Sequence, residues 1–580
     1  MKRLEKYTLI VLCISLLWCS MACSKHDTPS GSERTPANLK VKVTVQGSTA
    51  QMPDGDGSGA VSIEVSAQNA TNYQVILPTE NNKTFTINTP SGGQANYTFS
   101  GSPNTTATFP VQVIAYNGSA HKDTSFSVKV YFAALQSDVD FWLTTPDKSV
   151  LFSKQNTALN FVTTSNSYST ITVNDQKKYQ SIDGFGFTLT GGSAELINGL
   201  DEQTKDNLLK ELFLTDGTGI GISYLRLSIG ASDLSSSAYT YDDSPGDSEL
   251  KNFSIDKEKE DLLPLLKKIL ALNPDIKILA TPWSAPAWMK SNNSLYGGGD
   301  QPGILLPKYF DVYADYFVKY IQAMKAAGVP IDAVTVQNEP LNSYNNPSML
   351  MTDTAENEFI KNYLWPAFNK NGIDTKIIVY DHNLDHPEYA KYVLSDPDTY
   401  KMVDGSAFHL YAGDISTMSS IHEAFPDKNL YFTEQYTSAT GDFGGDLNWH
   451  IQNLIIGATK NWSRNVLEWN LAADAQNQPH LQGGCSDCLG ALTISGNSVT
   501  KRNQSYYIIA HASKFVRPGS SRIDCSEVSN LLSVAFLTPE NKKVLIVLNK
   551  ASQAQSFNIQ YGGKMVTTAL PAGAVGSFIW

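Results

Sequence analysis

Two glutamates stand in settings that could support acid and nucleophile chemistry. Glu339 lies in the run Val-Gln-Asn-Glu-Pro at 336–340 and Glu434 lies in Tyr-Phe-Thr-Glu-Gln at 431–435, so each ends a short strand-like apolar segment. Two carboxyl groups about 5 Å apart can break an acetal by double displacement, one as the acid and the other as the nucleophile. The elements around the two glutamates must therefore bring them to one site.

From about residue 179 the chain alternates strand-like runs with amphipathic helical runs, which is typical of βα units and a parallel sheet. Helical runs cover 202–213, 257–272, 307–327, 355–371 and 506–515. Candidate strands begin near Ser181, Ile222, Ile276, Ala333, Lys376, Asp404, Asn429 and Asn465. Eight strands over roughly three hundred residues predict an α/β fold of the (β/α)₈ TIM barrel type. A doubly wound open sheet is the alternative, but no Gly-rich phosphate loop follows any strand.

In this barrel Glu339 and Glu434 belong to the fourth and seventh strands, which face one another across the barrel mouth. The C-terminal ends of the strands carry the active site in this fold. Closely opposed carboxylates raise the pKa of one member, which leaves a protonated acid beside an ionised nucleophile.

Polar and aromatic side chains are dense at the other predicted strand ends. One such group would mean little, since carboxylates and Asn often cap helices there. Together they favour a site for a polyol; they are Arg226, Asp233, Trp283, Asn338, Asp381, His382, His409, Tyr411, Glu468, Trp469 and Asn470.

Some of these side chains suggest particular contacts with a sugar. Asn338 could bond a 2-hydroxyl in the transition state. Trp283, Trp288 and Trp469 offer flat apolar faces for sugar rings, and core packing is the alternative for Trp288. His409 and Tyr411 lie two residues apart and point the same way along a strand, where they could orient the nucleophile or bond a hydroxyl; an isolated His would more simply be structural.

The regions on either side of the barrel are rich in alternating apolar residues. Residues 38–134 contain short period-two runs with turn residues between them, which predict an immunoglobulin-like β-sandwich. A spacer is the favoured role of this domain, and a carbohydrate-binding module is the alternative. The tail 517–580 is small for an independent sandwich, so strands within 138–178 are expected to complete it across the barrel region 179–516.

The N-terminus has the features of an export signal. Residues 1–22 give a basic start, an apolar segment and a small-residue exit, and Ser-Met-Ala-Cys at 20–23 resembles a loose lipobox. We expect Cys23 to be lipidated, residues 23–37 to form a flexible tether, and the protein to be anchored in the bacterial outer membrane or at the cell surface. Ordinary signal cleavage, leaving a periplasmic or secreted protein with Cys23 free, is the alternative.

The composition excludes several partners. A net charge of −12, with 56 acidic and 44 basic residues, argues against nucleic acid and anionic polymers. None of the nine histidines lies in a metal-binding HxH or HExxH motif, so no metal or other cofactor is expected. Cys485 and Cys488 lack the second ligand pair of a zinc site and are expected to form a local disulfide or to be two free thiols. A monomer is expected.

Nine ordered sequence blocks resemble glycoside hydrolase family 30, the glucosylceramidase-like retaining enzymes. They begin at Asp183 (DGFG), Arg226 (RLSIGASD), Tyr239 (YTYDD), Thr281 (TPWSAPAWMK), Val336 (VQNEP), Phe408 (FHLY), Phe432 (FTE), Trp469 (WNLA) and Ser513 (SKFVRP). The resemblance covers residue 138 to the C-terminus. It implies a TIM barrel fused to a β-sandwich made from both of its flanks.

The resemblance also implies roles for individual residues. Glu339 would be the acid/base and Glu434 the nucleophile. Arg226 would support Glu434 or its neighbours. The glucose on the non-reducing side of the cleaved bond would be held by Asp233, Trp283, Asn338, His409, Tyr411 and Trp469.

Two stretches bear on the substrate within the family. Thr-Leu-Thr-Gly-Gly-Ser-Ala at 188–194 and Phe-His-Leu-Tyr-Ala-Gly-Asp at 408–414 look like the endo-β-1,6-glucanase branch, and the first departs from the glucosylceramidase version. We therefore expect an enzyme that cleaves a pustulan-type β-1,6-glucan. The alternatives are an exo-acting β-glucosidase or glucosylceramidase-like enzyme and, from another class, a non-catalytic glycan-binding lipoprotein.

Overall fold

The structure is a computed structural model and describes residues 34–77, 83–133 and 136–580. Contacts between residues divide the chain into two compact units, Met1–Leu135 and Gln136–Trp580. The predicted signal segment, the lipidation site Cys23 and residues 24–33 of the predicted tether lie outside the described residues. Among the helices that the structure describes, none combines the length and the apolarity needed to cross a bilayer.

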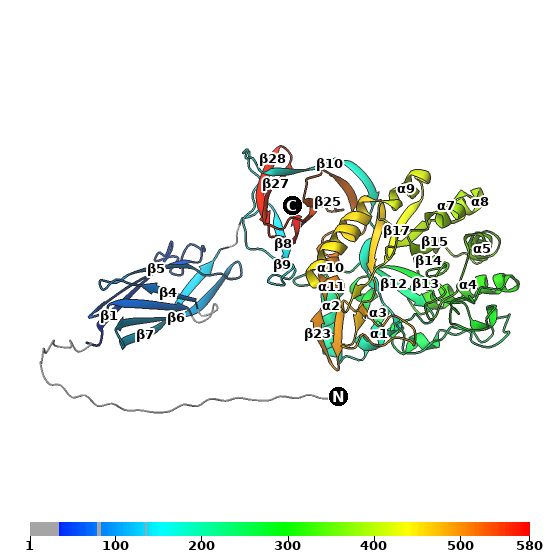
Figure 1. The fold of residues 1–580 in the computed structure, drawn as a ribbon, viewed down its shortest axis with the longest axis horizontal. Helices are drawn as coiled ribbons and strands as arrows, with labels where there is room; N and C mark the ends of the chain where they lie inside the picture. The colour runs from blue at the N-terminus through cyan, green and yellow to red at the C-terminus, as the bar shows by residue number, and fades with distance from the viewer. Residues whose placement is uncertain (1–33, 78–82, 134–135) are drawn as a thin grey trace, which may run out of the picture. The chain divides into compact units, whose positions relative to one another are not determined.

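The first unit is an all-β domain with two antiparallel sheets (Figure 1). One sheet contains β1 (Ala37–Val45), β2 (Ala60–Gln68) and β5 (Gly93–Thr98). The other contains β3 (Asn72–Leu77), β4 (Lys83–Ile87), β6 (Thr105–Asn117) and β7 (Ala120–Phe132). Period-two alternation explains the domain, because inward residues such as Ile63 on β2 and Val113 on β6 are buried while their sequence neighbours are more exposed.

Eight parallel strands form a closed barrel in the second unit, which confirms the TIM barrel predicted from the sequence. They are β11 (Gly184–Thr188), β12 (Tyr224–Ile229), β13 (Lys277–Pro282), β14 (Ala333–Thr335), β15 (Lys376–Asn383), β16 (Gly405–His409), β17 (Asn429–Glu434) and β19 (Ser463–Glu468). The strands are almost wholly buried because helices cover their outer faces. Pairing of β11 with β19 closes the barrel, and residues such as Leu279, Ile378 and Tyr431 fill a layer inside it.

Amphipathic helices surround the barrel (Figure 1). They are α1 (Gly191–Asn198), α2 (Glu202–Phe213), α3 (Leu262–Leu272), α4 (Phe310–Ala326), α5 (Asp353–Phe359), α6 (Trp365–Lys370), α7 (Pro387–Ser395), α8 (Pro397–Met402), α9 (Thr417–Ala424), α10 (Phe443–His450) and α11 (Gln504–Ser513). Helix α2 begins where the Asp201 carboxylate accepts a hydrogen bond from the Thr204 N–H, and it buries Leu208 and Leu212 against the barrel core.

A nine-stranded sheet flanks the barrel and contains strands from both ends of the second unit. Its order is β28 (Lys564–Leu570), β27 (Gln555–Tyr561), β10 (Ser169–Ser181), β24 (Ser521–Cys525), β25 (Leu531–Leu537), β26 (Lys543–Asn549), β29 (Val575–Ile579), β8 (Asp140–Thr144) and β9 (Ser153–Lys154). Strand β10 pairs with β24 antiparallel and with β27 parallel, so the segment before the barrel does complete the C-terminal sandwich as predicted. Short strands in the loops above the barrel are β18 (Thr437–Ser438), β20 (Ala472–Ala473), β21 (Cys488–Leu489), β22 (Leu492–Ser495) and β23 (Ser498–Arg502).

Candidate active site

Glu339 and Glu434 meet at the mouth of the barrel. Glu434 is the last residue of β17, whereas Glu339 lies four residues beyond the end of β14 at Thr335. The interpretation that both glutamates end strands is therefore wrong for Glu339, which has a left-handed φ of 45° and donates its N–H to the Asp381 carbonyl over 3.0 Å. A carboxyl oxygen of Glu339 lies within 4.8 Å of one of Glu434. This spacing suits a retaining glycosidase, since inverting enzymes keep their carboxyls about 6.5–9.5 Å apart.

Arg226 on β12 holds Glu434 in place. Its Nη1 atom donates to Glu434 Oε2 over 2.5 Å, and its Nη2 atom donates to Asn338 Oδ1 over 2.7 Å and to Asp381 Oδ2 over 2.9 Å. The side chain is fully buried, and its guanidinium carbon lies 4.9 Å from the Trp283 ring centroid. One planar cation thus positions three polar groups from three other strands or loops, which suits the fork geometry of arginine.

Asp381 is the buried anion beneath the site. Its Oδ2 atom accepts from Arg226, Thr281 and Thr335, and its Oδ1 atom accepts from Thr433 over 2.6 Å. A register shift in β15 accompanies left-handed φ values of 75° at Tyr380 and 68° at Asp381. This local strain turns Asp381 into the barrel mouth. The sequence placed Asp381 at a strand end but did not select it as a site residue.

His409, the last residue of β16, connects Asp381 to the glutamate pair. Its Nε2 atom lies 3.0 Å from Asp381 Oδ1, and its Nδ1 atom lies 3.2 Å from Glu339 Oε1 and 3.8 Å from Glu434 Oε1. Burial opposes a charge on the ring, but the surrounding carboxylates raise the pKa of His409 to about 9. At neutral pH it is therefore an imidazolium that donates through both nitrogens.

Two further side chains contact the remaining carboxylate oxygens. The Tyr411 hydroxyl donates to Glu434 Oε1 over 2.9 Å, and burial raises the pKa of Tyr411 well above its usual value, so it stays a donor. Asn342 Nδ2 donates to Glu339 Oε2 over 2.7 Å. Asn342 is a site residue that the sequence analysis missed, because its place in the loop after Glu339 carries no motif.

Two stacked tryptophans and a disulfide also lie near the two glutamates. The Trp283 and Trp469 rings stack with centroids 5.4 Å apart and an interplanar angle of 27°. Cys485 and Cys488 form a disulfide, one of the two states left open by the sequence. The Cys485 N–H donates to Asp233 Oδ2 over 3.1 Å, and burial raises the pKa of Asp233 to about 7.

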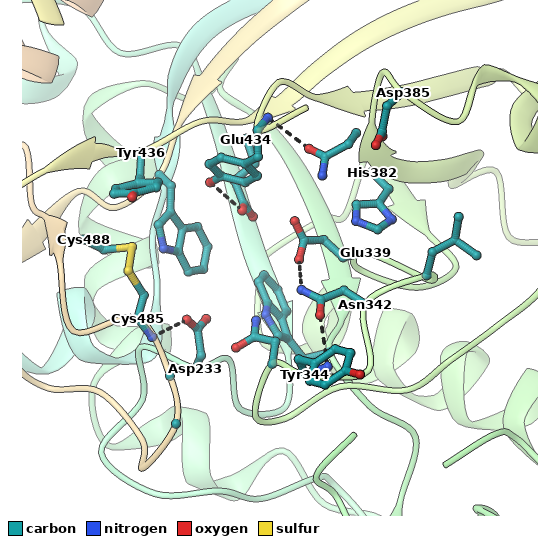
Figure 2. Close-up of a pocket in the computed structure, with 18 of the residues that line it drawn as sticks. Asp233, Glu339, Asn342, Tyr344, His382, Asp385, Glu434, Tyr436, Cys485 and Cys488 are labelled. Atoms are coloured by element: carbon teal, nitrogen blue, oxygen red, sulfur yellow. Dashed lines mark hydrogen bonds between the residues drawn. A yellow bond between two sulfur atoms is a disulfide. The ribbon is translucent and has the colours of Figure 1, made fainter. Parts of the chain in front are cut away.

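These groups surround a cavity of about 620 Å³ (Figure 2). Of the residues predicted to form the site, Asp233, Trp283, Glu339, Tyr411, Glu434 and Trp469 line it. Arg226, Asn338 and His409 lie just behind and bond to the lining carboxylates or to each other. His382, which the sequence placed at a strand end, also lines it. The lining further includes residues that were not predicted: Leu341, Asn342, Tyr344, Asn345, Asn383, Asp385, His386, Tyr436, Gly483, Gly484, Cys485 and Cys488.

The oxygen and nitrogen atoms of Glu339, His409 and Glu434 are close enough together to hold a metal ion. The donor chemistry of His409 argues against this use. Both ring nitrogens face carboxylates, and the raised pKa keeps a proton on each at neutral pH. An imidazolium has no lone pair to give to a metal.

The Thr-Gly-Gly-Ser motif at 190–193 lies behind the site rather than in it. Thr190 and Ser193 hydroxyls donate to Asn470 Oδ1 over 3.1 and 2.6 Å, which fixes the residue after Trp469. A Cβ atom at Gly192 would lie 2.5 Å from Pro479 Cγ. The motif therefore permits the close approach of the loop that continues to Cys485.

A closed (β/α)₈ barrel whose mouth holds two carboxyls at this spacing, backed by Arg226 and His409, defines a retaining glycoside hydrolase. The model described as the glycosyl hydrolase family 30 TIM-barrel domain matches residues 182–516, and the family 30 beta sandwich domain matches residues 519–578. The chain belongs to glycoside hydrolase family 30, as its sequence blocks indicated.

Several known proteins are similar to about two thirds of the chain or more. The endo-1,6-beta-D-glucanase neg1 of Aspergillus fumigatus is 36% identical over 394 residues, which cover 64% of this chain and 78% of the fungal protein. The lysosomal acid glucosylceramidase of Mus musculus is 30% identical over 438 residues, covering 71% of this chain and 83% of the mouse protein. Among solved structures, the endo-beta1,6-glucanase BT3312 superposes with a TM-score of 0.71 at 34% identity, covering 77% of this chain and 99% of that one.

Proposed function

We propose that this enzyme is an endo-β-1,6-glucanase that cleaves its substrate with retention of anomeric configuration. The observation that carries the mechanism is the glutamate pair, with carboxyl oxygens within 4.8 Å and Glu434 held by Arg226. The linkage is supported by the similarity to the two endo-β-1,6-glucanases, which are 36% and 34% identical to this chain.

In the first step Glu434 attacks the anomeric carbon of the bound glucose, and Glu339 gives a proton to the leaving oxygen. For a β-1,6 linkage this oxygen is the primary O6 of the next sugar. In the second step Glu339 removes a proton from water, which attacks the glycosyl ester and restores Glu434. Asn338 presents its carbonyl oxygen to Arg226, so its amide group is oriented to donate to the sugar 2-hydroxyl.

His409 is placed to set the protonation states that this mechanism needs. Burial and the facing Glu339 carboxylate raise the pKa of Glu434, and His409 and Arg226 oppose that increase. In the free enzyme burial opposes a charge on Glu339, but His409 and Asn342 favour the charged form and hold its pKa low. Catalysis requires the proton on Glu339 instead. Because the Nδ1 atom of His409 faces Glu339, it can pass its proton to that carboxylate while Glu434 stays ionised beside Arg226.

The test is hydrolysis by the purified protein of pustulan, laminarin, xylan and glucosylceramide. We expect the enzyme to release short gentio-oligosaccharides from pustulan and to release nothing from the other three substrates. Activity on another of these substrates without release from pustulan would refute the linkage. Proton NMR of the first products should show the β-anomer, and early α-anomer would refute retention.

An exo-acting, glucosylceramidase-like enzyme is the second candidate, because the mouse glucosylceramidase is 30% identical over 438 residues. The two candidates differ in the size of their products. An endo enzyme produces a ladder of oligosaccharides at early times, whereas an exo enzyme releases only glucose.

We further propose that the enzyme is exported as a monomer and anchored by a lipid on Cys23 in the outer membrane or at the cell surface. The basic start, apolar segment and lipobox-like Ser-Met-Ala-Cys at 20–23 support this proposal. The first unit would be an immunoglobulin-like spacer, a role that its two sheets suit. A Cys23→Ala change should move the enzyme from the membrane fraction to the soluble fraction of a bacterial host; unchanged membrane association would contradict the anchor.

A further inference from the structure

Tyr344 is a large aromatic residue that lines the mouth of the active-site cavity and is 70% exposed. By contrast, Trp283 and Trp469 in the same cavity are almost wholly buried. Leaving an aromatic ring in water forgoes the free energy that its burial would provide. An exposed ring at the rim of a binding cavity is therefore a candidate contact for a ligand.

The Tyr344 ring is held in one position although it is exposed. Its hydroxyl donates to the Asp300 carboxylate, and its N–H donates to Asn342 Oδ1 over 3.0 Å. The ring also lies against Gly299, where an added Cβ would be 3.3 Å from Tyr344 Cε1. The Gly299 N–H donates to the Ser343 carbonyl over 2.9 Å, which joins the two loops. A sugar that stacks on this ring would not have to immobilise it first.

The position of Tyr344 is tied to the acid/base side of the site. Asn342 Oδ1 accepts from the Tyr344 N–H, and Asn342 Nδ2 donates to Glu339 Oε2. The other oxygen of Glu339 faces His409. Because Glu339 must protonate the leaving oxygen, the sugar attached to that oxygen lies beside Glu339 and the loop that carries Asn342 and Tyr344.

Asp233, one of the residues predicted to hold the glucose on the non-reducing side of the cleaved bond, lies on one side of the glutamate pair. Figure 2 shows Asp233 and the Cys485–Cys488 disulfide on one side of Glu434 and Glu339, with His382 and Asp385 on the other. In the same view Asn342 bonds to Glu339, and Tyr344 lies beyond Asn342, to which its N–H is bonded. The cavity thus continues past the acid/base, where polar groups of Asp385 and His386 also line it.

We propose that Tyr344 is the stacking platform of a +1 subsite, the position that binds the glucose residue released with the leaving oxygen. The inference deepens the proposed function and rests on it. The ring offers its face to the C–H side of the sugar, and the Asp300 and Gly299 contacts keep that face presented. The flexible C5–C6 bond of a β-1,6 linkage lets the leaving glucose turn onto the platform while its O6 stays beside Glu339.

The test compares two substrates that have the same sugars on the non-reducing side of the cleaved bond and different leaving groups. Gentiotetraose places glucose in the +1 subsite, whereas β-gentiobiosyl fluoride has only a fluoride leaving group. The variants are Tyr344→Ala and Tyr344→Phe in the full chain. Tyr296→Ala is the matched control, because Tyr296 is also exposed, at 43%, but does not line the cavity.

Tyr344→Ala should lower kcat/KM for gentiotetraose about tenfold and leave kcat/KM for the fluoride within about twofold of wild type. Tyr344→Phe keeps the ring and should stay near wild type with both substrates, as should Tyr296→Ala. Equal losses on both substrates, or no loss on either, would overturn the subsite. A wild-type enzyme that hydrolyses the fluoride but leaves gentiotetraose intact would instead overturn the proposed function, and the subsite with it.

Discussion

The guanidinium of Arg226 and the carboxylate of Glu434 form a buried ion pair, with Nη1 and Oε2 2.5 Å apart. The same guanidinium also bonds Asp381 and Asn338. The orientation of the nucleophile is thereby linked to the anion under the barrel mouth and to the amide that faces the sugar. Asp381 in turn bonds His409, which contacts Glu339. Both glutamates thus belong to one hydrogen-bonded network.

Replacing Arg226 with Lys should impair catalysis although it keeps the charge. A single ammonium cannot reach Glu434, Asn338 and Asp381 together as the guanidinium fork does. We expect kcat on gentiotetraose to fall about 100-fold or more, because the nucleophile is no longer fixed. Arg226→Ala should also destabilise the protein by about 3–5 kcal/mol, since two buried anions lose their partner. A kcat of Arg226→Lys close to that of the wild type would contradict the positioning role of Arg226. Circular dichroism spectra of the variants serve as the control that they are folded.

Glu339→Gln and Glu434→Gln should respond differently to the leaving group. Glu339→Gln removes the acid, so it should still form the glycosyl-enzyme quickly from 2,4-dinitrophenyl β-gentiobioside, whose leaving group needs no proton. Glu434→Gln removes the nucleophile and should lose about 10⁴-fold or more in kcat on every substrate. Burst kinetics and rescue of Glu339→Gln by azide measure the difference. The opposite pattern would exchange the two roles.

Opening the Cys485–Cys488 disulfide should weaken substrate binding. The disulfide closes the loop whose N–H bonds Asp233, and both cysteines line the cavity. We expect Cys485→Ser/Cys488→Ser to raise KM roughly fivefold with a smaller change in kcat, on the scale of one lost hydrogen bond. Cys525→Ser is the control, because Cys525 is the free cysteine of the described chain and lies in β24 of the flanking sheet. An equal rise in KM in the control would contradict the prediction.

Stability should depend on pH through His409. Its pKa is raised from 6.5 to about 9 in the folded protein, so the contribution of the charged ring is complete below pH 6.5. That contribution is lost as the pH rises through about 9, and it is on the order of 3 kcal/mol. The thermal midpoint of the wild type should therefore fall more between pH 6.5 and 9.5 than that of His409→Gln. Parallel curves for the two proteins would show that the ring does not titrate in this range.

The barrel and the glutamate pair could be predicted because buried parallel strands leave near-continuous apolar runs. The strands predicted to begin near Ala333, Lys376 and Asn429 begin at those residues, and the one expected near Ser181 begins at Gly184. Asp381 could not be selected, because its role depends on a bulge in β15 and on hydroxyls from three other strands. The disulfide was left open since sequence spacing does not reveal the 5.7 Å Cα–Cα distance of Cys485 and Cys488. Tyr344 was missed for the same reason, as only the fold brings its loop to the cavity.

The strand β10 runs in the flanking sheet between β24 and β27 and leads directly into the first barrel strand, β11. The N-terminal and C-terminal parts of the catalytic unit are therefore joined by hydrogen bonds of β10, which precedes the barrel in sequence. A protein truncated where the barrel begins would lack β10 and would expose the edges of β24 and β27. The natural module for recombination or fusion in this protein is Gln136–Trp580, the whole second unit.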